Sequence, residues 1–437
     1  MVSLFCFVAV AAMAILAVTR HRIFVICGLY CFYSLLTVLD PETVPRLGPI
    51  TIYRAIYLIM FVSLVARLVQ DGNFLSQMRR LPLTSYFFLV LLILASSLYS
   101  QTSHTFIAEG NPTVWDSMIV MLLFWMAASQ VQREVDLKIM AATTVLVSLV
   151  LCVWVVWNAA QLNFAAAGRG GIEVNQNYVA AFLLLGGLPL VYLLFTAGKL
   201  WLKLLSWPLL IVVLLGALIL ASRGIFAGFI AAVIWIAGTS VRGRRRSTLV
   251  VAGASLVLIV GVALMLPGGG GLLARFQEGD LATLNERTIL WSYSFKHFSE
   301  SSLVRMIFGQ GLSSQNVVLG PYVRYGALNY HNQYLKFLME QGVVGVAAFL
   351  VFLYAVIRQV LRSDHPLKPV MLGWIGFLMV ASLSATLADN HEFWILLGVA
   401  VGVCALPNPS KKETGPLATR IVPQPSSSLF PRAMGGA

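Results

Sequence analysis

The long polar stretch from Pro267 to Tyr334 decides how the rest of this chain is interpreted. It opens with PGGGG at residues 267–271, and residues 331–335, HNQYL, lead from its end directly into an apolar segment. It is the only long polar interruption in an otherwise apolar sequence. Structureless loops of this length are unusual in compact proteins. We therefore predict that the stretch is partly helical and functional.

The composition outside this stretch is that of a membrane protein. Of the 437 residues, 59% are hydrophobic and 11% are charged, whereas soluble proteins carry roughly 25% charged residues. Successive apolar runs are long enough to cross a hydrocarbon core of about 30 Å as helices. The sequence therefore predicts an all-α fold: a polytopic transmembrane helical bundle of twelve or thirteen spans with one long, partly helical periplasmic loop.

The predicted spans follow the apolar runs along the chain. They lie near 3–19, 23–39, 50–69, 82–99, 114–130, 137–160, 174–197, 203–221, 224–240, 248–266, 336–357, 369–388 and 391–406. If all of them cross the membrane, the amino terminus lies outside. If the first is an interfacial segment, twelve remain and both ends lie inside.

The net charge of +13 is divided among short loops, where it indicates orientation rather than nucleic-acid binding. The basic loops that mark the cytoplasmic side contain Arg79–Arg80, Lys199 and Lys203, Arg242–Arg246, Arg358 to Lys368, and Lys411–Lys412. The alternate loops, including 267–335, then face outward. Four regions are expected: 1–266 and 336–406 as parts of the transmembrane bundle, 267–335 as a periplasmic loop with catalytic groups, and 407–437 as a disordered cytoplasmic tail.

The sequence carries no motif for metal, nucleotide or disulfide chemistry. All five cysteines fall inside apolar runs and none forms a CxxC pair, so neither a disulfide framework nor a zinc site is expected. Walker A, HExxH and GxSxG motifs are absent. We therefore predict an enzyme without a metal or cofactor, which must receive an already activated substrate.

Arginines on the outward side are the first candidate site residues. Arg223 lies in the Ser-Arg-Gly turn of a tight hairpin between two apolar runs. It is either a snorkelling turn residue or a ligand-binding group, and positive charge on the outer side has no topological use. Arg287 either pairs with Glu286 or joins Arg223, Arg305 and Arg324 on the same side. Several guanidinium forks that converge on one point suit a diphosphate.

Histidine and amide side chains are the second set of candidates. His331 precedes the helix that leaves the loop, where a histidine is commonly solvated or capping. An imidazole near arginines would instead stay neutral and could act as a base. Asn332 either fixes the local turn or contacts substrate. Arg169 and Asn175, in another outer loop, are candidates for sugar contacts, although Asn175 also fits a helix cap.

Several stretches occur in an order that resembles the O-antigen ligase family, within the larger group that includes O-antigen polymerases and O-linked oligosaccharyltransferases. They are LASRG at 220–224, NERTILW at 285–291, FGQG at 308–311, and HNQYL at 331–335 followed by EQG at 340–342. Each motif alone is weak, but their order and the loop between them are fairly specific. The resemblance covers most of the chain from about Asn175 to Glu392.

The resemblance implies an inverting, metal-independent glycosyl transfer at the periplasmic face of the bacterial inner membrane. The implied donor is undecaprenyl-diphosphate-linked O-antigen, and the implied acceptor is a sugar hydroxyl of lipid A–core. It assigns the diphosphate to Arg223 and Arg287, with Arg324 and Arg305 as lesser anion contacts, and the role of base to His331. The implied partners are these two lipid-linked substrates and membrane lipids, with no nucleic acid.

Two other readings remain open. An O-antigen polymerase would use the same donor with an O-antigen acceptor, and the residues do not separate it from a ligase. A transporter of the lipid-linked sugar would need polar groups at the membrane midplane, whereas here they gather at the outer end.

Overall fold

The structure, a computed structural model, describes residues 11–17, 19, 21–39, 46–47, 50–72, 74–98, 100, 114–161, 176–220, 222–240, 287–320 and 329–406. The chain divides into two units, Met1–Leu406 and Pro407–Ala437, and all the described residues belong to the first. The predicted spans 248–266 and, for the most part, 3–19 lie outside the described residues.

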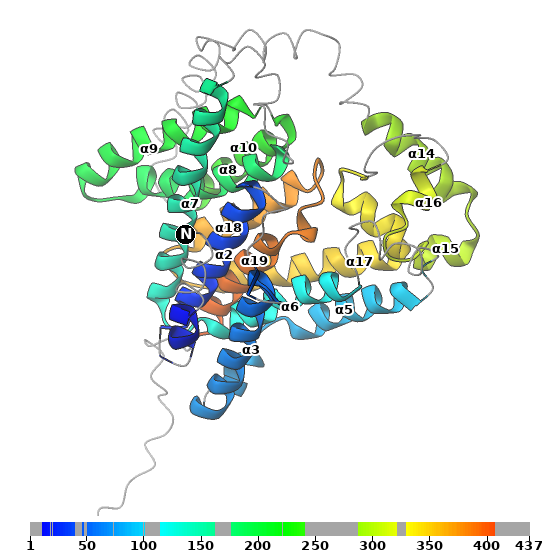
Figure 1. Cartoon of the computed structure of the whole chain (residues 1–437), viewed down its shortest axis with the longest axis horizontal. Coiled ribbons are helices and arrows are strands. Elements are labelled where there is room, and N and C mark those ends of the chain that lie inside the picture. Colours follow the sequence, from blue (N-terminus) through cyan, green and yellow to red (C-terminus); the bar gives the residue numbers. More distant parts are fainter. Residues whose placement is uncertain are drawn as a thin grey trace, which may run out of the picture. The chain divides into compact units, whose positions relative to one another are not determined.

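The described part is almost wholly helical (Figure 1). Its helices are α2 (Ile23–Leu39), α3 (Ile52–Gln70), α4 (Phe74–Met78), α5 (Leu83–Leu98), α6 (Val114–Gln130), α7 (Glu134–Gln161), α8 (Gln176–Thr196), α9 (Leu200–Ile219), α10 (Arg223–Ser240), α14 (Arg287–Glu300), α15 (Leu303–Phe308), α16 (Gln315–Leu319), α17 (Gln333–Arg362), α18 (Lys368–Ala381), the 3₁₀ helix η1 (Leu387–Asp389) and α19 (His391–Cys404). Two short strands, β1 (Arg46–Leu47) and β2 (Ile50–Thr51), pair antiparallel.

Helix length and composition confirm the predicted fold class. Within the described residues, α7, α8, α9, α10 and α17 are each at least 18 residues long and apolar enough to cross a membrane. An 18-residue helix extends about 27 Å, close to the thickness of the hydrocarbon core. Shorter apolar helices accompany them in α2, α3, α5, α6, α18 and α19. The protein is a polytopic helical membrane protein.

Most predicted boundaries agree with the helices to within a few residues, and two differ more. The span predicted at 336–357 is α17, which runs from Gln333 to Arg362 because Asn332 caps it earlier. The span predicted at 369–388 ends at Ala381, since residues 382–386 form turns before η1. This polar turn contacts several predicted site segments.

Helix α8 is the centre of one group of helices. Every residue from Val179 to Val191 is buried, as expected of a helix that is apolar on all sides. It contacts α7, α9, α10 and α18. Helices α10 and α18 approach closely where Gly228 faces Ala381. Small residues at helix contacts allow such approach in membranes.

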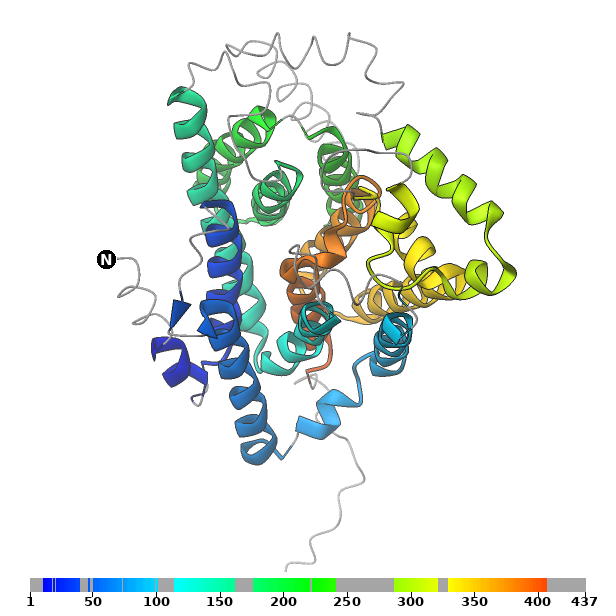
Figure 2. The same ribbon diagram turned by 45° about the vertical axis from the view of Figure 1, so that its right-hand side comes forward.

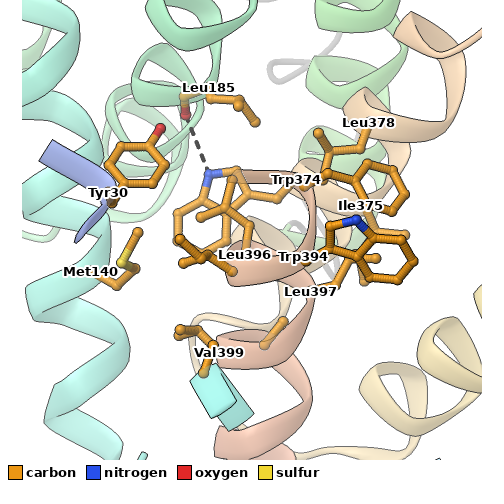
Figure 3. Close-up of a cluster of buried hydrophobic side chains, with 14 of the residues drawn as sticks. Tyr30, Met140, Leu185, Trp374, Ile375, Leu378, Trp394, Leu396, Leu397 and Val399 are labelled. Atoms are coloured by element: carbon orange, nitrogen blue, oxygen red, sulfur yellow. Dashed lines mark hydrogen bonds between the residues drawn. The ribbon is translucent and has the colours of Figure 1, made fainter. Parts of the chain in front are cut away.

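Two tryptophans fill the centre of the core (Figure 3). Trp374 of α18 and Trp394 of α19 are both fully buried. The indole N–H of Trp374 donates to the carbonyl of Leu185 in α8 at 3.3 Å. That of Trp394 donates to the carbonyl of Ala388 at 2.7 Å. Each buried donor is therefore paired, which avoids the cost of an unsatisfied polar group.

A buried arginine joins the carboxyl ends of several helices. Arg67 of α3 donates to the Val131 carbonyl at 3.0 Å and to the side-chain oxygen of Gln77, and it pairs with Asp71 at 3.4 Å. Gln77 in turn donates to the carbonyls of Val131 and Gly402, at 3.2 and 3.4 Å. Since α19 ends near Gly402, this cluster marks one end of the bundle, and the start of α19 marks the other.

Replacing Arg67 by alanine should lower the free energy of unfolding by about 3 kcal/mol, because the buried side-chain oxygen of Gln77 loses its Arg67 donor and the Val131 carbonyl loses one of its two donors. Thermal unfolding of the purified protein in detergent measures the change. Arg133→Ala is the matched control, since the Arg133 side chain is 47% exposed and its contact with Asp136 spans 3.5 Å. That variant should lose less than about 1 kcal/mol. Equal losses in both variants would contradict a structural role for the cluster.

Candidate functional site

The end of the long loop forms an unusual turn before α17. The Asn332 side-chain oxygen accepts hydrogen bonds from the backbone N–H groups of Tyr334 and Leu335, both at 3.0 Å, and so caps the helix. His331 has a positive φ of 48°, and its backbone N–H donates to the Asn329 side-chain oxygen at 2.8 Å. Few non-glycine residues adopt this conformation, and it occurs often at functional sites.

The surroundings of the imidazole disfavour its protonated form. His331 is half-buried. Burial first, and the positive charge of Arg287 second, lower the pKa of His331 from 6.5 to about 4. The imidazole is therefore neutral at neutral pH, and the electrostatic influence of Arg287 means that these two residues lie near each other. The structure thus brings together two of the predicted site residues.

Helix α14 carries Arg287 to this position. Arg287 is the first residue of the helix, and burial lowers the pKa of its guanidinium. One turn later, the indole N–H of Trp291 donates to the carbonyl of Tyr330, the residue before His331, at 2.9 Å. Trp291 also packs with Phe298 and Tyr330 against the start of α17. This bond and this packing hold the start of α14 beside the histidine.

The aromatic side chains of α14 form a narrow buried face. Trp291 and Phe298 pack against the small hydrophobic cluster, whereas Phe295 is 53% exposed. At 100° per residue, Phe295 lies only about 40° from Trp291 around the helix axis, so the buried face does not extend that far.

Hydrogen bonds between backbone groups join the segment after α15 to α17. Figure 2 shows the helices of this loop beside α17. Gly342 has a φ of 69° and interrupts the helix there. The carbonyls of Met339 and Glu340 accept hydrogen bonds from the N–H groups of Gln310 and Gly311, at 2.7 and 3.0 Å. A Cβ on Gly342 would overlap the carbonyl of Ile307. The kink in α17 therefore provides the docking point for the segment that follows α15.

Arg223 begins α10 in a turn that is packed on two sides. The hydroxyl of Ser222 donates to the Asn177 side-chain oxygen at 2.6 Å, near the start of α8. Gly224 lies so close to Ser384 that a Cβ would overlap that side chain. Arg223 itself is half-buried. The turn is therefore positioned between the start of α8 and the turn that follows α18.

The turn at 382–389 also contacts the histidine segment. The Thr386 hydroxyl lies 3.3 Å from the Asn329 side-chain nitrogen and 3.1 Å from the Tyr178 hydroxyl. The backbone N–H of Gln333 donates to the carbonyl of Ser382 at 2.8 Å, and its side chain accepts from the N–H of Ala388 at 2.9 Å. The starts of α8, α10 and α17 thus meet at one turn, which Arg223 and His331 both adjoin.

An ion pair that the sequence interpretation missed lies next to these groups. The Lys336 ammonium contacts both carboxylate oxygens of Asp389, at 2.7 and 2.8 Å. Lys336 is 9% exposed and belongs to α17, five residues after His331. A charged residue early in an apolar span was an available signal, because such residues generally have a partner and a function. Its partner, 53 positions away, could not be identified from the sequence.

The other predicted residues fall into two groups. Arg305 is exposed on α15. Its positive charge helps to lower the pKa of His297 of α14 and is not among the causes that lower the pKa of His331. The oxygen of Asn332 caps α17, which leaves only its side-chain nitrogen for a substrate contact. Arg324, Arg169 and Asn175 lie outside the described residues.

Comparison with known families identifies the region that carries these groups. Residues 208–350 match a family model described as O-antigen ligase. The matched segment contains Arg223, Arg287 and His331, and also the kink at Gly342. A comparison with curated proteins found no match. The protein is therefore a polytopic membrane protein with apolar spanning helices, and its segment 208–350 is similar to the O-antigen ligase family.

Proposed function

We propose that this protein is an O-antigen ligase. It transfers a glycan from undecaprenyl diphosphate to a sugar hydroxyl of lipid A–core, with inversion at the anomeric carbon and without a metal or cofactor. The reaction takes place at the periplasmic face of the bacterial inner membrane. The observation that carries the proposal is the neutral, half-buried His331 beside Arg287, in a segment that shares its supporting turn with Arg223.

In the proposed reaction, the acceptor oxygen attacks the anomeric carbon of the donor sugar. The bond between that carbon and the diphosphate oxygen breaks, and the diphosphate leaves with the electron pair. His331 takes the proton of the acceptor hydroxyl, a contribution of about 10²–10⁴-fold in rate for a general base. Arg287 and Arg223 stabilise the negative charge that develops on the leaving group.

The helix starts around the supporting turn add to the positive potential. The N-termini of α8, α10 and α17 meet there, and a helix N-terminus carries roughly half a positive charge. These partial charges favour a diphosphate at the same place as the two arginines. Arg324 is retained as a further proposed anion contact, and Arg169, Asn175 and the nitrogen of Asn332 as proposed sugar contacts.

The pH dependence of transfer should report the lowered pKa of His331. The base must be neutral, so kcat/KM should be independent of pH near neutrality and fall as the pH decreases through about 4, the pKa of the free enzyme. Bound diphosphate offsets the charge of Arg287 and raises the pKa of His331, so the acid limb of kcat should lie at higher pH than that of kcat/KM. An acid limb of kcat/KM near pH 6.5, the ordinary pKa of histidine, would contradict this assignment.

Reconstitution tests the activity itself. Purified protein in phosphatidylcholine vesicles is supplied with undecaprenyl-diphosphate-linked O-antigen and rough lipopolysaccharide in the presence of a chelator. The expected product is lipopolysaccharide extended by O-antigen, detected by its shifted electrophoretic mobility. Movement of the donor across the bilayer without transfer would identify a transporter and overturn the proposal.

An O-antigen polymerase is the second candidate, because it would use the same donor and the same charge arrangement. The reconstitution separates the two when lipopolysaccharide is left out. A polymerase then lengthens the glycan on undecaprenyl diphosphate, whereas a ligase forms no extended product. Elongation without lipid A–core would replace the ligase assignment by the polymerase.

A further inference from the structure

Helix α15 exposes an unusual number of apolar side chains for part of a polar loop. In this six-residue helix, Leu303 is 72% exposed, Val304 66% and Phe308 48%, and none of its residues is fully buried. Exposed apolar area costs about 25 cal/mol per Å² in water, and apolar patches of this kind mark interaction surfaces. We call Leu303, Val304 and Phe308 the α15 patch.

The position of α15 along α17 indicates what covers this patch. The segment after α15 bonds to the carbonyls of Met339 and Glu340, and the carbonyl of Ile307 abuts Gly342. These residues lie six to nine positions inside α17, which begins at Gln333, or about 9–14 Å along its axis. The first turns of α17 carry Lys336 and Glu340, and its continuous apolar stretch begins at Val343. Since α17 is one of the helices that can cross a membrane, α15 lies next to the point where the polar start of this helix gives way to its apolar stretch.

The α15 patch continues an exposed apolar face of α17. Val343 directly follows the docking point and is 52% exposed. Leu350, Val351 and Tyr354, at 44%, 56% and 64% exposure, follow on the same side of the helix at a spacing of seven, eight and eleven residues. An exposed apolar face on a membrane-spanning helix contacts lipid, so the adjoining patch meets the same surroundings.

The position of Arg305 agrees with contact between α15 and lipid. Arg305 is exposed in the middle of α15, next to Val304. Long basic side chains keep their charge at the lipid head groups while their neighbours contact acyl chains. The charge of Arg305 is then used at the membrane surface and not for the donor diphosphate.

We propose that α15 is an interfacial membrane helix, which lies in the boundary layer of the bilayer with the α15 patch among the acyl chains and Arg305 at the lipid phosphates. The occupant of this surface is the lipid bilayer. The helix would then hold the long loop, and with it α14, at a fixed depth beside α17. This proposal does not depend on the reaction that the protein catalyses.

Fluorescence quenching by brominated lipid tests this placement. Val304→Cys is labelled with a bimane fluorophore and reconstituted into phosphatidylcholine nanodiscs, with or without dibrominated acyl chains, and label on the unsubstituted chain is subtracted. Ser299→Cys is the matched control, because Ser299 is also exposed but lies on polar α14. Brominated lipid should reduce the Val304 signal by about twofold or more, as for an interfacial helix, and leave the Ser299 signal nearly unchanged. Aqueous iodide should quench the label at residue 299 more strongly than the label at residue 304.

Two outcomes would overturn the proposal. Absence of quenching by brominated lipid at both positions would place α15 above the membrane. Protection of Val304 from both quenchers would mean that a protein or glycan covers the patch. Leu303→Cys provides a second probe of the same face if the first variant does not insert. Because the readout is independent of glycan transfer, a failed ligase assay leaves this test unaffected.

Discussion

Replacing His331 by asparagine should lower kcat of glycan transfer by about 10²–10⁴-fold, the contribution of a general base. Asparagine tolerates the left-handed conformation that His331 adopts, with φ of 48°, so the turn before α17 is retained. It cannot accept the proton of the acceptor hydroxyl. Initial rates of transfer onto rough lipopolysaccharide at saturating donor measure the loss.

A second histidine in the same loop supplies the control for this substitution. His297 of α14 is also half-buried, but it lies near Arg305 and Glu300 and not at the α17 cap. His297→Ala should therefore transfer glycan at nearly the normal rate. His331→Ala should be as impaired as His331→Asn, although it also strains the backbone. Near-normal transfer by folded His331→Asn would remove the histidine-base assignment.

Substitution of Arg287 should separate its two proposed effects, on the diphosphate and on the histidine. Arg287→Lys keeps a positive charge but loses the planar fork that binds phosphate oxygens in pairs, so we expect kcat to fall by about 10²-fold. Arg287→Gln should lower kcat at least as much. It should also move the acid limb of kcat/KM to higher pH, because the charge that lowers the pKa of His331 is lost while its burial remains.

The pH profile distinguishes loss of the positive charge at residue 287 from loss of the planar guanidinium. In Arg287→Lys the acid limb should remain near its original position, since the positive charge is retained. Lys296→Gln is the matched control on the same helix, because the Lys296 side chain is 60% exposed and distant from the cap. It should change neither kcat nor the limb. An unmoved limb in Arg287→Gln would show that Arg287 has no electrostatic influence on the catalytic base.

The fold could be predicted well because the length of each apolar run largely determines where a spanning helix lies. An apolar run must be about 20 residues long to cross a bilayer, so the predicted span 114–130 coincides with α6 and 137–160 falls within α7. The predicted end of the span 369–388 was wrong, because the sequence after Ala381 is only weakly polar. Residues 382–386, SLSAT, interrupt the helix. The Ser384 hydroxyl there donates to the Ala381 carbonyl, and such a bond competes with the helix.

The site could be predicted less completely, because its contacts join distant positions. Arg287 and His331, predicted to meet from a shared side of the membrane and the resemblance, lie close enough for the charge of Arg287 to lower the pKa of His331. The Lys336–Asp389 pair and the shared turn at Thr386 were missed. Their spacing along the chain follows no periodic pattern, so only the tertiary structure brings them together. The functional roles of Arg223, Arg287 and His331 stay predictions.

The kink at Gly342 has a consequence for how freely the loop sequence can vary. The loop is anchored there by peptide groups of residues 310, 311, 339 and 340, which every amino acid except proline supplies. Other side chains in the anchored segment can therefore be exchanged without detaching it, provided that Gly309, Gly311 and Gly342, which all have positive φ and closely approached backbone, remain glycine. Under the proposed function, this arrangement would let the loop change its sugar contacts while the backbone anchor stays the same.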